Sequence, residues 1–133
     1  MLRASIATIA LVLAGCAVVE VVPPRHLHGQ KGEPGTTPVA HIEARVWGWY
    51  LLKFIPILAG NPRAPGLPGM PVPLRHTVKL ENVMDMVAKK SRELGADELR
   101  DVVSHDLSKW QPLTLVFWIN EYEISANAVK RED

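Results

Sequence analysis

The 133-residue sequence predicts an α+β fold: a small antiparallel sheet of three to five strands, with one main helix at about residues 81–94 packed on one face. Three observations support this class. Apolar and polar residues alternate over several short stretches, as is typical of half-buried strands. One stretch has the three-and-four spacing of an amphipathic helix. The chain is also long enough to bury a substantial core within one domain.

The first sixteen residues carry the most specific pattern of the sequence. Arg3 supplies a positive charge near the N-terminus, and residues 4–13 are uncharged and mostly apolar. That length suits the apolar region of a secretory signal peptide and is too short for a bilayer span, which needs about 20 residues. The motif Leu13-Ala14-Gly15-Cys16 that follows resembles the lipobox of bacterial lipoprotein precursors.

This resemblance implies that residues 1–15 are a lipoprotein signal peptide. Cys16, the only cysteine, would receive a diacylglyceryl group with palmitate-type acyl chains and become the first residue of the mature protein. In bacteria with two membranes, an aspartate after the cysteine usually retains lipoproteins at the inner membrane, so Ala17 implies the outer membrane, facing the periplasm. The alternative is an uncleaved signal anchor over residues 4–19, a length that is marginal for a transmembrane helix.

Two segments are rich in residues that interrupt regular structure. Residues 16–38 predict the lipidated cysteine followed by a flexible tether, because prolines and glycines recur throughout. Residues 39–133 are then a single α+β domain. Within it, residues 60–73 hold five prolines and three glycines, which predicts a surface loop.

Residues 39–60 predict the apolar centre of the domain. Ile42, Ala44 and Val46 alternate with polar neighbours, as in a half-buried strand, and the pattern then becomes almost continuously apolar. We favour core packing for this segment. The alternative is an interfacial segment with aromatic rings at headgroup depth, which makes Trp47, Trp49 and Tyr50 the candidate interaction surface.

The helix is predicted from a stripe at helical spacing and from its ends. The stripe consists of Leu80, Val83, Met84, Val87, Ser91 and Leu94. Gly95 follows, where a helix commonly ends in the left-handed conformation. Basic residues gather in the last turns, which complements the helix dipole.

Three further strands are expected. Residues 74–80 alternate as a strand with one wet face, and residues 113–130 predict one long bent strand or a hairpin turning near Asn120 and Glu121. Residues 97–110 fit either a helical stripe or a strand. The stretches SRELGAD, LRDVVSHDLS and ISANAVK, within residues 78–130, are similar to small, mostly uncharacterised α+β envelope lipoproteins. That resemblance implies a strand at residues 98–106.

Charge and chemistry narrow the function classes. Without Arg3 the chain has 14 basic and 14 acidic residues, scattered along it, so nothing favours nucleic acid as a partner. Adjacent Ser104, His105 and Asp106 point to opposite faces of a strand and cannot form a hydrolase triad. His26 and His28 lack further ligands at metal spacing, and the pair Glu121 and Glu123 fits a solvated edge.

The sequence therefore predicts no catalytic residue, no metal site and no cofactor. We expect a non-enzymatic interaction or structural module of the bacterial cell envelope. It would be held to the membrane through Cys16 and have an envelope protein as its partner. The alternative is a ligand- or metal-binding envelope sensor.

Overall fold

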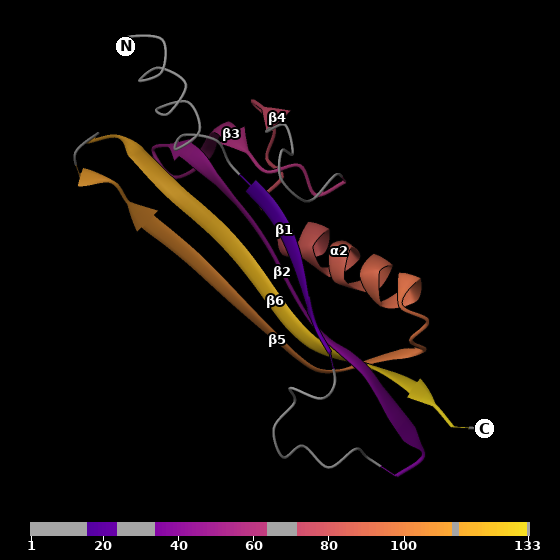
Figure 1. Ribbon diagram of the computed structural model, residues 1–133. Helices are drawn as coiled ribbons and strands as arrows, with labels where there is room; N and C mark the ends of the chain where they lie inside the picture. Colours follow the sequence, from indigo (N-terminus) through magenta and orange to yellow (C-terminus); the bar gives the residue numbers. More distant parts are fainter. Residues whose placement is uncertain (1–15, 24–33, 64–71, 113–114, 133) are drawn as a thin grey trace, which may run out of the picture.

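The computed structural model describes residues 16–23, 34–63, 72–112 and 115–132. These residues form one antiparallel sheet with a helix on one face, which confirms a small α+β fold (Figure 1). The sheet makes up more of the molecule than the sequence suggested. The strands are β1 (Cys16–Val22), β2 (Thr36–Leu51), β3 (Ile55–Ala59), β4 (Val72–Pro73), β5 (Glu98–Trp110) and β6 (Phe117–Arg131), and the helix is α2 (Leu80–Glu93).

The long strands β2 and β6 form the centre of the sheet. The strand order is β4-β3-β2-β6-β5, with β1 also paired to β2. β1 follows β2 from His41 to Trp47, and β3 follows it from Gly48 to Leu51. These two short strands therefore lie one after the other on the same edge of β2, while β5 forms the opposite edge of the sheet (Figure 1).

β1 changes the expected domain organisation. The sequence placed residues 16–38 in a tether, but Cys16–Val22 pairs with β2 over seven residues and β2 itself starts at Thr36. The folded sheet thus begins at Cys16 rather than near residue 39. The physical reason is that β1 is rich in β-branched valines, which pack well on a half-buried sheet once β2 offers them an edge. Residues 1–15 lie outside the described part of the chain.

The strand expected at residues 74–80 is wrong. Its backbone groups bond locally instead: the Thr77 amide donates to the Arg75 carbonyl, and the Lys79 amide donates to the Thr77 carbonyl. Such bonds between residues two apart close γ-turns and leave no ladder to a neighbouring strand. Of the Pro-rich loop at residues 60–73, only Val72–Pro73 forms a strand, and residues 64–71 are outside the described part.

The other strand predictions are confirmed with new bounds. The apolar segment at residues 39–60 is a hairpin of β2 and β3, whose turn holds Leu52 and Lys53 at positive φ. The ambiguous stretch is a strand and continues to Trp110. The closing segment is the single strand β6, so the alternative turn near Asn120 is wrong.

The core lies between α2 and the sheet. Side chains at even positions point to the helix and are buried from Ala40 to Tyr50 of β2 and from Ile124 to Ala128 of β6, notably Ile42, Val46 and Ile124. Small residues on the same face, including Ala44 and Ala126, let the helix lie close to the strands. Burying a Val or Ile side chain contributes about 1.5–3 kcal/mol, so this single interface provides most of the apolar stabilisation.

α2 buries a slightly different stripe from the predicted one. Val83, Val87 and Ser91 are buried as expected, and Met86 takes the buried position predicted for Met84. The two ends of the predicted stripe, Leu80 and Leu94, are exposed instead, because they lie at the first turn and the C-cap of the helix. The helix ends at Leu94 and Gly95, and Gly95 has φ +79°. The Ala96 amide donates to the Ser91 carbonyl and the Gly95 amide to the Arg92 carbonyl, which is the bond pattern of the Schellman motif.

This helix end makes substitutions at Gly95 informative. A Cβ there meets no atom within 4 Å, so the effect comes from backbone strain alone. We expect Gly95→Ala to lower the free energy of unfolding by about 1 kcal/mol and Gly95→Val by more, because side chains disfavour positive φ. Gly95→Asn is the matched control, since asparagine tolerates this conformation. Urea unfolding measures the series, and equal losses for Asn and Val would contradict the assignment.

Candidate functional site

Cys16 is built into the edge of the sheet. It is the first residue of β1, lies opposite Trp47 of β2 and is half-buried. Gly60 packs against it: the Gly60 amide donates to the Trp47 carbonyl at 3.1 Å, and a Cβ on Gly60 would lie 2.2 Å from the Cys16 carbonyl carbon. Glycine at position 60 therefore lets the chain enter the sheet at Cys16.

The face of the sheet opposite α2, called here the open face, carries the residues at odd positions of β2. Among the described residues, no helix covers it. On β2 the open face changes from polar His41, Glu43 and Arg45 to apolar Trp47 and Trp49. Its two tryptophans are half-buried by their neighbours rather than by a second layer.

The structure divides the candidate interaction surface of Trp47, Trp49 and Tyr50 between the two faces of the sheet. Neighbouring residues of a strand face opposite sides, so Tyr50 lies on the helix side, where it is fully buried in the core. Trp47 and Trp49 remain on the open face. Trp49 packs edge-on against Phe117 at 6.3 Å between ring centroids, and its buried Nε1 has no hydrogen-bond partner among the described atoms.

Tyr50, a core residue, contacts His76 in the segment that precedes α2. The Tyr50 hydroxyl lies 2.8 Å from His76 Nδ1, and the two rings meet edge-on at 5.6 Å. Burial raises the pKa of Tyr50 above 10.0, although a backbone hydrogen bond at Val78 opposes the shift. Much of His76 is exposed, but partial burial of the ring, with the positive charge of Lys79, lowers its pKa below 6.5.

A cavity of about 320 Å³ opens beside this pair. Lys53, His76 and Lys79 line it together with Asp106 and Ser108. The lining contains serine, histidine and aspartate, but the first two are directed to other partners: the Ser108 hydroxyl donates to Asn120 Oδ1 at 2.7 Å, and His76 Nδ1 faces Tyr50. The arrangement is suited to holding a small polar ligand rather than to activating a nucleophile.

A second polar group crosses the middle strands at the far end of the sheet. His41 Nδ1 lies 2.7 Å from Asn127 Oδ1, and Asn127 Nδ2 donates to Asp101 Oδ2 at 2.9 Å. Asp101 has positive φ at a bulge where the β5–β6 register shifts. Periodicity did not identify this chain of contacts, because it depends on a bulge that only the strand pairing creates.

The other candidates from the sequence separate in the structure. Ser104, His105 and Asp106 are exposed along the edge strand β5 and alternate between its faces, as expected. Glu121 and Glu123 do share the open face, opposite Trp47 and Arg45 respectively. His26 and His28 lie outside the described residues. Within the described ranges, no three histidine, cysteine or acidic side chains are grouped to hold a metal ion.

Comparisons with known proteins do not assign the site. No protein-family model, no curated protein and no solved structure matches the chain. In the described part of the chain, no helix is long and apolar enough to cross a membrane.

The contact between Tyr50 and His76 predicts a pH dependence. Because the pKa of His76 is lower in the folded state than its usual 6.5, the unfolded chain binds the proton more readily. Stability is therefore complete above pH 6.5 and falls as the pH drops below it, levelling off under the folded pKa. We expect the thermal midpoint to fall between pH 7.5 and 5.5, and to fall less in His76→Gln. An equal fall in both proteins, by calorimetry, would contradict this assignment.

Proposed function

We propose that this chain is a lipid-anchored protein of the bacterial cell envelope that acts as a non-enzymatic interaction or structural module. The observation that carries the proposal is the motif Leu13-Ala14-Gly15-Cys16 behind a positively charged residue and a short apolar run. Length, position and composition of this leader agree with a lipoprotein signal peptide. Ala17 favours the outer membrane over the inner one in a bacterium with two membranes.

The position of Cys16 in the fold supports this anchor. Because β1 starts at Cys16, no linker residues lie between the cysteine that would carry the lipid and the sheet. Two or three acyl chains bind a membrane stably, whereas one binds reversibly. An anchor attached directly to an edge strand would hold the sheet against the bilayer surface and restrict its orientation.

The exposed edge of the sheet supports an interaction role. β5 is an edge strand, and its residues from Asp101 to Trp110 are exposed, among them Val102, Val103 and Leu107. An exposed edge can accept a strand from another protein through main-chain hydrogen bonds. An envelope protein with a free strand is therefore the kind of partner that this edge fits.

The anchor is tested by Cys16→Ser in the native cell or a related bacterial host. Without the thiol no lipid can be attached, so we expect the variant to lose acyl labelling and normal cleavage of the leader. Glu20→Gln is the matched control, because Glu20 is exposed on the same strand and lies outside the lipobox. Normal processing and detergent partitioning of Cys16→Ser would overturn the proposal.

A second candidate function is the binding of a small ligand by a sensor. It is favoured by the 320 Å³ cavity with Lys53, His76 and Lys79 in its lining, since ligand sites start at about 300 Å³. The lining also contains the carboxylates of Asp106 and Glu121, so a small polar ligand with both acceptor and donor groups fits it best, and carboxylates and phosphates probe its cationic side. Titration with carboxylates and phosphates, followed by NMR, should move the His76 resonances, and Lys79→Ala should weaken the effect. A lack of shifts at millimolar concentration would remove this candidate.

A further inference from the structure

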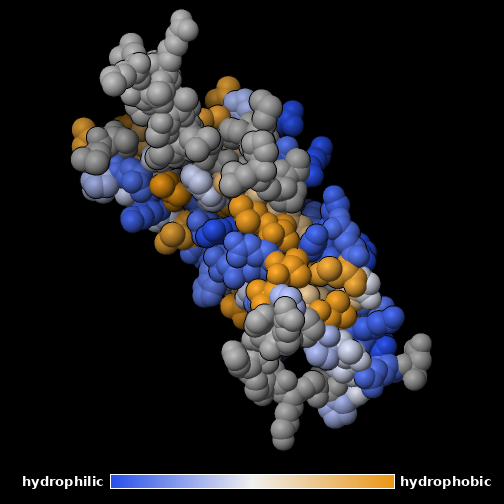
Figure 2. All heavy atoms as spheres, viewed as in Figure 1, coloured by the Kyte–Doolittle hydropathy of each residue, from blue (hydrophilic) through white to orange (hydrophobic). Residues whose placement is uncertain are grey.

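The two turns at one end of the sheet expose a group of large apolar side chains, called here the apolar tip. It consists of Leu52, Phe54, Ile55, Trp110, Leu115 and Val116. Phe54 is 72% exposed and Leu115 is 75% exposed. Leu52 and Phe54 lie in the β2–β3 turn and Ile55 starts β3, while Trp110 ends β5 and Leu115 and Val116 lie in the β5–β6 connection, so separate parts of the sequence meet at this end (Figure 1). Figure 2 shows apolar side chains exposed there and along β1.

The apolar tip is held as one surface. The Leu52 amide donates to the Val116 carbonyl at 2.8 Å, and Asn120 Nδ2 donates to the Lys53 carbonyl at 2.8 Å. Leu52, Lys53 and Leu115 all have positive φ, which is unfavourable for side chains of this size. Strained backbone conformations concentrate at functional positions. The two hydrogen bonds thus fix the turns in a backbone conformation that keeps these apolar side chains exposed.

We infer that the apolar tip inserts into the interfacial region of a bilayer with anionic headgroups, beside the lipid on Cys16. This inference rests on the proposed lipid anchor and adds a second membrane contact to it. Contiguous exposed apolar patches mark contact surfaces. The following three observations select a bilayer as the partner.

The first observation is where the open face changes polarity. Cys16 and Trp47 lie in one cross-strand row. In the next cross-strand row on this face, which lies farther from the tip, Val18 of β1 pairs with Arg45 of β2, and Arg45 pairs with Glu123 of β6. Toward the tip, the open face is apolar apart from Lys109, and its members there are Leu58, Trp49, Ile119, Ile55, Leu51 and Phe117. Cys16 therefore lies at the boundary between the polar part and the apolar part of the open face.

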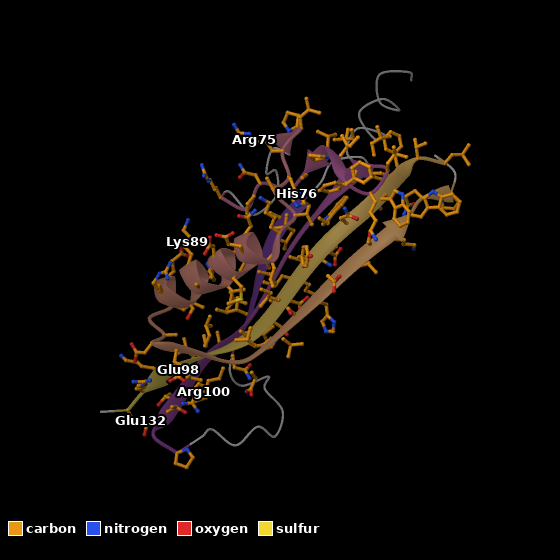
Figure 3. All side chains as sticks on the ribbon, turned by 180° about the vertical axis from the view of Figure 1, so that it is seen from behind. Arg75, His76, Lys89, Glu98, Arg100 and Glu132 are labelled. Atoms are coloured by element: carbon orange, nitrogen blue, oxygen red, sulfur yellow. The ribbon has the colours of Figure 1, made fainter. Side chains whose placement is uncertain are left out.

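The second observation is the distribution of charge. Residues 44–80 contain five basic residues and no acidic one, and residues 107–120 contain Lys109 and no acidic one. The two turns that carry the apolar tip lie within these segments, and Lys53 and Lys109 are their basic residues closest to it, whereas Arg45 and Glu121 lie farther along the strands. At the other end, far from Arg75 and His76 (Figure 3), basic residues are paired with carboxylates: Glu98 forms ion pairs with Arg100 and Arg131. Although the total charge is balanced, the residues around the tip therefore carry a positive charge, which attracts anionic lipid headgroups.

The charges also argue against the tip of a second copy as the occupant. Tip-to-tip packing would bring Lys53 and Lys109 of two chains together without a carboxylate in either segment. At a bilayer, the same lysines can extend their ammonium groups to the headgroups while their stems stay apolar. Tryptophan and phenylalanine beside lysine are typical of membrane interfaces.

The third observation is distance. Trp47, opposite Cys16, is four residues from Leu51 at the end of β2, which is about 13 Å along the strand. The interfacial region of one leaflet is about 5–7 Å thick. For Cys16 and the apolar tip to lie in it together, the strands must lie closer to the membrane plane than to its normal. The open face near Trp47 and Trp49 then faces the bilayer.

The experiment uses the mature lipidated protein in vesicles with one introduced cysteine. Lipidation consumes the thiol of Cys16, so the parent protein should not react with maleimide. Leu115→Cys places an environment-sensitive fluorophore on the apolar tip, and Lys130→Cys places it at the exposed opposite end of β6 as a control. Vesicles contain phosphatidylcholine alone or with phosphatidylglycerol.

With phosphatidylglycerol, we expect blue-shifted emission at position 115 and loss of about half of it to nitroxide-bearing lipids. Position 130 should respond as in water, and Lys109→Glu should weaken the response at 115. Equal, water-like emission at both positions would overturn the inference while leaving the anchor intact. A shift at 115 that follows protein density instead of lipid charge would also overturn it and indicate contact between copies. Maleimide labelling of the parent protein would instead overturn the anchor itself.

Discussion

The pairing of β2 with β6 is the interaction on which the rest of the structure depends. The two strands are antiparallel from Thr36 to Leu51 of β2, with one register shift after Pro38. Side chains alternate between the two faces along each strand, and residues paired across the strands lie on the same face. The register therefore assigns each residue to the helix face or to the open face. α2 covers one face, and the shorter strands attach to the edges that β2 and β6 leave free. If the register of β2 shifted by one residue, its buried apolar side chains would move to the open face, and the polar side chains of the open face would move into the core.

The helix face and the tip end obey different constraints. Beneath α2, small residues such as Ala44 and Ala126 allow close packing, and Tyr50 fills the wider space toward the turn. At the edge of this core, the Tyr50 hydroxyl forms a hydrogen bond with His76 Nδ1. Beyond Tyr50, the two turns bond to each other through their backbones, but the large side chains of the apolar tip stay exposed. The molecule is thus well packed at its centre and incomplete at one end.

The proposed anchor and the proposed membrane contact are consistent with this asymmetry. A lipidated protein does not need a soluble surface on all sides, because one end always lies near the bilayer. Exposed leucines and phenylalanine that would favour aggregation in a free protein are then shielded by lipid. The part of the edge strand β5 that is distant from the tip, from Asp101 to Asp106, remains exposed and available to a partner.

Local patterns in the sequence determined the leader hypothesis, the α+β class, the end of the helix at Gly95 and the alternation along β2. Each depends on neighbours in the chain, such as a positive φ that glycine favours or a period of two. Only tertiary structure decided that Cys16–Val22 joins the sheet, because an edge strand is stabilised by a partner strand whose paired residues lie 19 to 31 positions away. The same holds for Met86 replacing Met84 in the core, and for Tyr50 rather than Trp49 facing the helix. The apolar tip arises from two turns distant in sequence, so no single segment could predict it.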